Sequence, residues 1–264
     1  PIICVGNIYV GGTGKTPLSI LLANEIQKLG KETVILRKYY DSHNDEYELI
    51  KNNFNNLSIN KKRIDGILKA ERANYDIIIL DDGLQEYKIK KNLNIVCFNE
   101  KQLVGNGLVM PAGPLRENLN NLKSSDVVII NGNKNKSFEE KILNINNKLE
   151  IFYSNYKPQN IEKFKNKKLF AIAGIGNPGN FFQLIEDNDL SIKKKFIFPD
   201  HHKYSKNEIM NIVDEAKKEN CQIITTEKDY YKIKKFDIKI DYIKIFLNIE
   251  NKDILIDKIK KLYN

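Results

Sequence analysis

A glycine-rich segment near the start of the chain has the residue types of a phosphate-binding loop. Gly11-Gly12-Thr13-Gly14-Lys15-Thr16 follows an apolar run and comes directly before a stretch with helical periodicity. In such a loop the glycines let backbone N–H groups face phosphate oxygens, the lysine reaches the β- and γ-phosphates, and the threonine hydroxyl binds Mg²⁺. Tyr9 stands where the strict pattern asks for its first glycine, so the start of the loop must differ from the common one. The spacing predicts a nucleotide site.

Two adjacent acids at the end of a second apolar run could hold a metal ion. Asp81 and Asp82 directly follow Ile77-Ile78-Ile79-Leu80. Acids after a strand are often only a solvated turn, but a P-loop enzyme needs a carboxylate at such a strand end to hold Mg²⁺, directly or through water. We therefore predict that Asp81 or Asp82 contacts magnesium.

Two of the three histidines of the chain follow an acid in Asp200-His201-His202. Neighbouring residues on an extended segment point to opposite faces, so both imidazoles would not bind one metal ion. Two interpretations remain, a surface loop and a residue that orients a carboxylate base.

These motifs lie in a pattern of alternating strands and helices. The first half has expected strands at 2–5, 33–36, 75–80, 94–98 and 126–130, and an expected helix at 17–29. After the polar stretch 131–147, strands are expected at 151–153, 169–173, 196–198 and 223–225, and helices at 181–184 and 207–219. The alternation predicts an α/β fold, with a P-loop NTPase-type parallel sheet flanked by helices and a second smaller α/β domain. We place the domains at 1–150 and 151–264, with a boundary uncertain by about ten residues.

Composition excludes several classes of protein. With 41% hydrophobic and 29% charged residues, the 264-residue chain is neither disordered nor fibrous. Its three cysteines are far apart with no CxxC spacing, which indicates a reducing cytoplasm and no cysteine metal site. The net charge of +9 comes from lysines interleaved with asparagines. No basic stretch carries the aromatic residues of a nucleic-acid platform, so no nucleic-acid partner is expected.

The chain has no apolar run of the roughly 18 to 20 residues that span a bilayer, and no signal peptide. It starts at Pro1 rather than Met and passes at once into Ile2-Ile3-Cys4-Val5. We therefore expect that a further segment precedes Pro1 in the intact protein.

Several segments together resemble one family, the tetraacyldisaccharide 4′-kinases, and the match runs through nearly the whole chain. The segments that carry the resemblance are Val5-Gly6-Asn7, Val10 to Pro17, Asp81 to Gln85, Gly105-Asn106-Gly107, Pro111 to Glu117, Ala173 to Pro178, Phe181-Phe182, Phe198 to His202 and Thr226 to Asp229. The resemblance implies a P-loop core, a hinged smaller domain that contributes to the active-site cleft, and a hydrophobic helix upstream. It also implies ATP and Mg²⁺ as cofactors, the 4′-hydroxyl of a lipid A disaccharide 1-phosphate precursor as acceptor, and anchored or peripheral contact with the cytoplasmic face of a Gram-negative inner membrane.

The resemblance also implies roles for single residues. Lys15 and Asp45 align with catalytic residues, Asp45 as the base, and His201 would reach from the second domain to orient it and tune its pKa. Residues on the substrate side would be Asn7, Arg37, Arg63, Gln85 and Arg116.

Three departures from the family pattern fall near these residues. The family's Arg-Gly-Tyr-Gly turn is Arg37-Lys38-Tyr39-Tyr40 here, and its Gly-Asp-Glu-Pro is Asn44-Asp45-Glu46-Tyr47. Glu86 replaces a histidine that usually follows the glutamine. The loop on the acceptor side is therefore the segment that differs most.

Other P-loop classes fit less well. A partitioning-type switch ATPase that regulates through a membrane or nucleic acid would carry a second lysine just before the glycines, where this chain has Val10. A GTPase would carry an Asn-Lys-x-Asp motif, and Thr226-Glu227-Lys228-Asp229 has the wrong order. An inactive scaffold that retains the fold is the third alternative.

Overall fold

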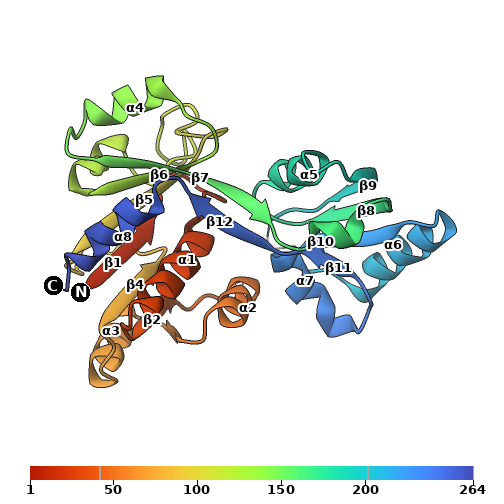
Figure 1. Cartoon of the computed structure of the whole chain (residues 1–264), viewed down its shortest axis with the longest axis horizontal. Helices are drawn as coiled ribbons and strands as arrows, with labels where there is room; N and C mark the ends of the chain where they lie inside the picture. The colour runs from red at the N-terminus through yellow and green to blue at the C-terminus, as the bar shows by residue number, and fades with distance from the viewer. Residues whose placement is uncertain (42, 201, 264) are drawn as a thin grey trace. The chain divides into compact units, whose positions relative to one another are not determined.

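The computed structural model describes the chain except for residues 42, 201 and 264 (Figure 1). Its contacts divide the chain into two compact units. The first unit contains Pro1–Tyr40, Asn53–Asn155 and Leu247–Asn264, and the second contains Asp41–Asn52 and Tyr156–Phe246. The sequence placed one boundary near residue 150, whereas the structure assigns 41–52 to the second unit and returns 247–264 to the first.

The first unit is built on an eight-stranded sheet with the order β12-β7-β6-β5-β1-β4-β2-β3. Its strands are β1 (Ile2–Gly6), β2 (Thr33–Lys38), β3 (Leu57–Asn60), β4 (Ile77–Asp81), β5 (Leu93–Asn99), β6 (Val127–Asn131), β7 (Glu150–Pro158) and β12 (Ile245–Ile249). Each neighbouring pair from β3 through to β7 is parallel. Strands such as β1 and β4 are near-continuous apolar runs because a parallel sheet is covered on both faces.

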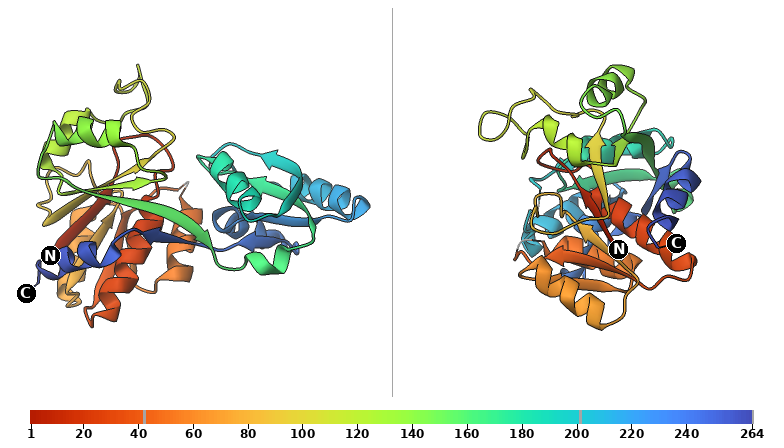
Figure 2. Two further views of the ribbon diagram at one scale, coloured as in Figure 1. Left: turned by 45° about the horizontal axis from the view of Figure 1, so that its top comes forward. Right: turned by 90° about the vertical axis from the view of Figure 1, so that its left-hand side faces the viewer.

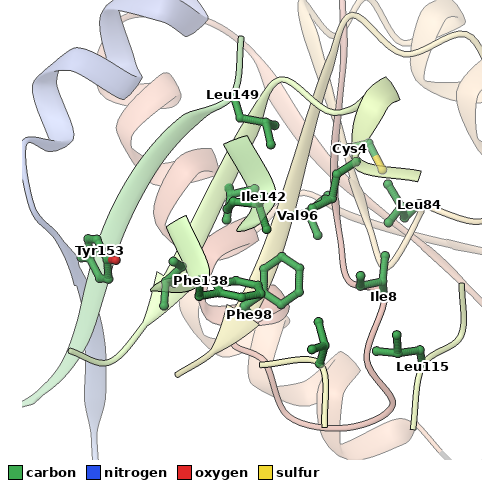
Figure 3. Packing of buried hydrophobic residues seen from close by; sticks show 14 residues of the cluster. Cys4, Ile8, Leu84, Val96, Phe98, Leu115, Phe138, Ile142, Leu149 and Tyr153 are labelled. Carbon is green, nitrogen blue, oxygen red and sulfur yellow. The ribbon is translucent and has the colours of Figure 1, made fainter. Parts of the chain in front are cut away.

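In the described part of the first unit there are four α-helices and a 3₁₀ helix at Leu119–Ser124. They are α1 (Lys15–Lys28), α3 (Arg63–Arg72), α4 (Lys136–Leu143) and α8 (Lys252–Lys260). One face of the sheet packs against α4, where Phe98 and Phe138 meet edge to face with ring centroids 5.0 Å apart (Figure 3). Cys4 and Val96 lie on this same face of the sheet. The predicted parallel sheet flanked by helices is confirmed.

The second unit has a four-stranded parallel sheet with the order β11-β10-β8-β9. Its strands are β8 (Lys168–Ala173), β9 (Ser191–Ile197), β10 (Gln222–Thr226) and β11 (Asp241–Ile243), and its α-helices are α2 (Asn44–Asn53), α5 (Pro178–Glu186), α6 (Lys206–Lys218) and α7 (Glu227–Ile233). Alternate residues of β8 point to opposite faces. Leu169 and Ala171 pack with α5, whereas Phe170 and Ile172 pack with α6.

The path of the chain links the two units at several places. The chain passes between the units within β7 and within β12, and it also leaves and rejoins the first unit around α2. Over the residues that the structure describes, no helix has the length and apolar character to cross a membrane.

Candidate active site

The phosphate loop connects β1 to α1, as the sequence predicts. Gly11 and Gly14 have φ angles of 119° and 92°, a left-handed region that favours glycine, and Gly14 caps the start of α1. The loop is held from inside by Asn7, which is fully buried and donates its amide N–H groups to the backbone carbonyl of Tyr9 and to Oγ1 of Thr13. Asn7 therefore supports the loop from below, although the resemblance assigned it to the substrate side.

The first turn of α1 brings the loop to the two acids at the end of β4. Thr16 Oγ1 donates a hydrogen bond of 3.0 Å to Oδ2 of Asp81, and Lys15 Nζ lies 3.5 Å from Oδ1 of Asp82. The parallel pairing of β1 with β4 is the cause, because it puts the carboxyl ends of both strands at the same edge of the sheet. The two strongest sequence motifs thus form one site.

Asp81 is completely buried and has polar partners on both oxygens. Oδ1 accepts from Ser19, Oδ2 accepts from Thr16, and the Arg37 guanidinium lies 2.9 Å from Oδ2. Arg37 is itself buried and also donates to Oγ1 of Thr16 at 3.2 Å. A buried ion pair is stable only where hydrogen bonds also satisfy the remaining lone pairs of the carboxylate. The hydroxyl groups of Ser19 and Thr16 supply those hydrogen bonds to Asp81. Asp81 therefore fixes the position of the Thr16 hydroxyl.

Asp82 has a different environment from its neighbour. It follows directly on β4 with a left-handed φ of 57°, and its carboxylate lies 3.5 Å from Lys15 and 2.9 Å from Arg116. Burial alone would raise the pKa of Asp82, but Lys15, Arg116 and the more distant Arg37 outweigh it and lower the pKa to about 2. Two cations beside the phosphate loop thus share one acid, which leaves positive charge where phosphates would bind.

Arg63, from the first turn of α3, closes the turn after β4. Its guanidinium donates to the backbone carbonyls of Asp81 and Asp82, and it forms a 2.8 Å ion pair with Glu86. Gln85, the residue before Glu86, donates to the Asn7 carbonyl. In the sequence Glu86 is only a departure from the family pattern, whereas in the structure it is the ion-pair partner of the buried Arg63.

A second charged cluster lies within the second unit, around Asp45 on α2. Asp45 is buried, and its Oδ2 lies 3.5 Å from Nζ of Lys228 and 3.3 Å from Nζ of Lys232. Lys228 also pairs with Glu46 and Asp200. Burial would lower the pKa of Lys228, but the carboxylates of Glu46, Asp45 and Asp200 outweigh it and raise the pKa.

The lysines of this cluster come from α7, whose start is fixed by Asp229. This fully buried carboxylate accepts hydrogen bonds of 2.8 Å from the Gly174 N–H and from the Thr226 hydroxyl, and Lys232 lies 3.1 Å away. A side chain at Gly174 would come within 2.6 Å of the Tyr204 hydroxyl, so the close approach requires glycine. The sequence points to the 226–229 motif, but it does not identify Lys228 of that motif and Lys232 beyond it as partners of Asp45. Their signal is a pair spaced four residues apart on one helix face.

The proposed partner of Asp45, His201, lies outside the described residues. Asp45 belongs to the second unit, whereas the sequence placed it in the domain of residues 1–150. The segment 41–52 leaves the first unit and packs with α7, and the pairing of Asp45 with His201 stays a prediction. His202, which the structure describes, has Nε2 at 3.2 Å from Oε1 of Glu208.

Comparison with known proteins agrees with this architecture. A family model described as tetraacyldisaccharide-1-P 4′-kinase matches residues 1–264. The tetraacyldisaccharide 4′-kinase of Pelagibacter ubique is 41% identical over 267 residues, which covers 98% of this chain and 84% of the relative. That of Rickettsia bellii is 36% identical over 276 residues and covers 98% and 85%.

A solved structure shares the fold. LpxK from Aquifex aeolicus, in complex with ATP, is similar with a TM-score of 0.72 over 100% of this chain and 89% of that chain, at 23% identity. These matches do not support the alternative of a partitioning-type ATPase.

Proposed function

Because the chain belongs to the tetraacyldisaccharide-1-phosphate 4′-kinase family, we propose that it transfers the γ-phosphate of ATP to the 4′-hydroxyl of a tetraacylated disaccharide 1-phosphate, a lipid A precursor. The observation that carries the proposal is the sharing of Asp82 by Lys15 and Arg116 directly beside the phosphate loop. Phosphoryl transfer depends on positioning and on charge stabilisation around the transferred group, and this edge of the sheet supplies both.

The donor set at this edge fits magnesium. Mg²⁺ prefers oxygen ligands and usually keeps several waters while it binds phosphates, and the available groups are the Thr16 hydroxyl and the carboxylates of Asp81 and Asp82. When bound, the ion supplies neutralisation of the phosphate charge. Asp81 holds the Thr16 hydroxyl in place, whereas Asp82 is paired with the cations that nucleotide phosphates would take over. We assign the β- and γ-phosphates to Lys15, with Arg116 beside them.

Asp45 is the proposed base for the acceptor hydroxyl. It is a buried carboxylate whose charge is compensated by the ammonium groups of Lys228 and Lys232. These positive charges favour the ionised carboxylate, which is the form that can accept a proton. His201 keeps its proposed role of orienting this base. The other residues expected on the substrate side hold the phosphate loop and the acid pair in position. They are Asn7, Arg37, Arg63 and Gln85.

The site of action follows from the acceptor. A tetraacylated disaccharide resides in a bilayer, so we place the reaction at the cytoplasmic face of a Gram-negative inner membrane, where ATP is present. This assignment predicts peripheral or anchored contact between the protein and the lipid surface.

The test is transfer of labelled γ-phosphate from ATP to a tetraacyldisaccharide 1-phosphate dispersed in detergent. Lys15→Ala should abolish the labelled lipid product, and Lys123→Ala, an exposed lysine of the same unit, should not change it. ATP hydrolysis that is indifferent to the lipid would contradict the proposal and favour a switch ATPase.

A further inference from the structure

The loop between β5 and the 3₁₀ helix carries apolar side chains in solvent. Leu108, Val109 and Met110 are consecutive in sequence and are 52%, 37% and 58% exposed. Val10, which is 43% exposed, is joined to the same loop because its N–H donates to the Pro114 carbonyl. Residues 102–115 contain no charged side chain. In both views of Figure 2 this loop extends away from the sheet of the first unit.

The loop is held in shape by its own hydrogen bonds. The side chain of Asn106 accepts from the Leu108 N–H and donates to the Ala112 carbonyl, so it bridges the two sides of the loop. A side chain at Gly113 would come within 2.2 Å of the Asn106 side chain, so this packing requires glycine. At the base of the loop Leu115 is fully buried beside Ile8 (Figure 3). The apolar tip therefore stands on a rigid support.

Several backbone N–H groups of the loop have hydrogen-bond partners within the loop itself. The Met110 N–H donates to the Leu115 carbonyl, and the N–H groups of residues 112 and 113 donate to the Val109 carbonyl. Pro111 and Pro114 have no N–H at all. An N–H group without a partner is costly in hydrocarbon, so the internal partners of these donors and of the Leu108 N–H lower the cost of placing the loop in the acyl region of a bilayer.

The loop is also continuous with the proposed phosphoryl-transfer site. It ends at Arg116, whose side chain pairs with Asp82, and it is hydrogen-bonded to Val10, which leads into the phosphate loop at Gly11. An acceptor with four acyl chains presents its sugar at the membrane surface. A rigid apolar tip on this loop would hold the reactive groups at that surface.

We propose that residues 108–110 form a membrane-docking tip that inserts into the acyl boundary of a phospholipid bilayer beside the site of phosphoryl transfer. The inference rests on the proposed function, since it is the lipid acceptor that makes a bilayer the expected occupant. Insertion itself needs neither ATP nor the acceptor. The two can therefore be tested separately.

The chain has no tryptophan, so Met110→Trp introduces a single fluorophore at the tip. Ile254→Trp is the matched control, because Ile254 lies on α8 of the same unit and is also 58% exposed. Vesicles of phosphatidylethanolamine and phosphatidylglycerol, with no ATP or acceptor, should shift the emission of the Met110→Trp variant to the blue. Brominated acyl chains should quench that variant and leave the Ile254→Trp variant unchanged.

Three results would overturn the proposal. They are no shift at the tip, equal shifts in both variants, and a shift without vesicles that grows with protein concentration, which would indicate self-association of the chain instead. If the tip inserts but no phosphate reaches the lipid acceptor, the docking inference survives and the proposed function fails.

A charge at the tip gives an independent measurement. Met110→Glu should reduce co-sedimentation with the same vesicles by roughly tenfold, whereas Ile254→Glu should leave it unchanged. With the acceptor embedded in vesicles, Met110→Glu should raise KM for the lipid and leave KM for ATP unchanged. Unaltered sedimentation and lipid KM in this variant, with its thermal unfolding preserved, would contradict the docking role.

Discussion

Removal of the Asp82 carboxylate should change nucleotide affinity in opposite directions with and without magnesium. The cations around Asp82 lower the pKa of its carboxyl from an ordinary 3.8 to about 2. One pKa unit corresponds to about 1.4 kcal/mol, so the net effect of burial, which opposes ionisation, and of the cations favours the ionised carboxylate by about 2 kcal/mol. Lys15 makes the largest favourable contribution of the four cations, and an ion pair at nearly the separation of Lys15 from Asp82 is worth about 1 kcal/mol in a water-like dielectric.

In the absence of Mg²⁺, ATP phosphates and the Asp82 carboxylate compete for Lys15. Asp82→Asn ends the competition, and the Kd for ATP in EDTA should fall by roughly fivefold, since about 1 kcal/mol is a factor of this size. With Mg²⁺ present the variant loses an oxygen ligand of the proposed metal site. The Kd for MgATP should then rise by roughly tenfold, and kcat should fall by at least roughly a hundredfold.

Isothermal titration calorimetry with ATP in EDTA and in excess Mg²⁺ measures both affinities. Asp65→Asn, an exposed aspartate on α3 of the same unit, is the matched control and should change neither. An unchanged Kd in EDTA would show that Asp82 does not compete with phosphates for Lys15. Tighter binding of ATP to Asp82→Asn in both buffers would exclude Asp82 as a magnesium ligand.

Three further predictions concern the base, the pH dependence and the Arg63 contact. Asp45→Asn and His201→Ala should each lower kcat by roughly 10²- to 10⁴-fold with ATP affinity retained. In steady-state assays the double variant should have a kcat little lower than that of the more impaired single variant. If the two losses multiply instead, the residues act independently and do not form a dyad. Because the pKa of Asp82 is lowered on folding, its stabilising contribution is present above about pH 4 and is lost as pH falls through about 2. Urea unfolding of the native chain and of Asp82→Asn should therefore converge in that window, and a constant difference would contradict the assignment. Glu86→Gln, at a one-third exposed side chain, should cost less than about 1 kcal/mol, whereas Arg63→Met should cost about 3 kcal/mol or more; equal costs in urea titrations would disprove the buried role of Arg63.

Local structure around the phosphate loop could be predicted because its causes lie within a few residues. The loop requires glycine at Gly11 and Gly14, where φ is positive, and it follows a short apolar strand. The helix expected at 17–29 is α1, Lys15–Lys28, since its apolar residues recur at helical spacing. The central strands could also be predicted, because burial on both faces makes them nearly continuous apolar runs.

Edge strands have weaker apolar patterns in the sequence. The sequence predicts a strand only at 196–198, whereas β9 covers Ser191–Ile197. The reason is that β9 is an edge strand of its sheet and carries three exposed lysines. Charged residues on such a strand limit pairing with other chains and also hide the apolar pattern. The short helix α2 was missed as well, and with it the membership of Asp45 in the second unit.

The sequence by itself determined the chemistry of the site: the phosphate loop, the two acids after an apolar strand, and the resemblance to a kinase family. Only the tertiary structure distinguished Asp81, which holds Thr16 and Arg37, from Asp82, which is shared by Lys15 and Arg116. The same holds for the pairing of Asp45 with the α7 lysines. Dihedral preference and hydrophobic periodicity act over a few residues, whereas these contacts join residues at least 34 positions apart in the chain. They exist because parallel strands bring their carboxyl ends to one edge and because the chain crosses between its two units more than once.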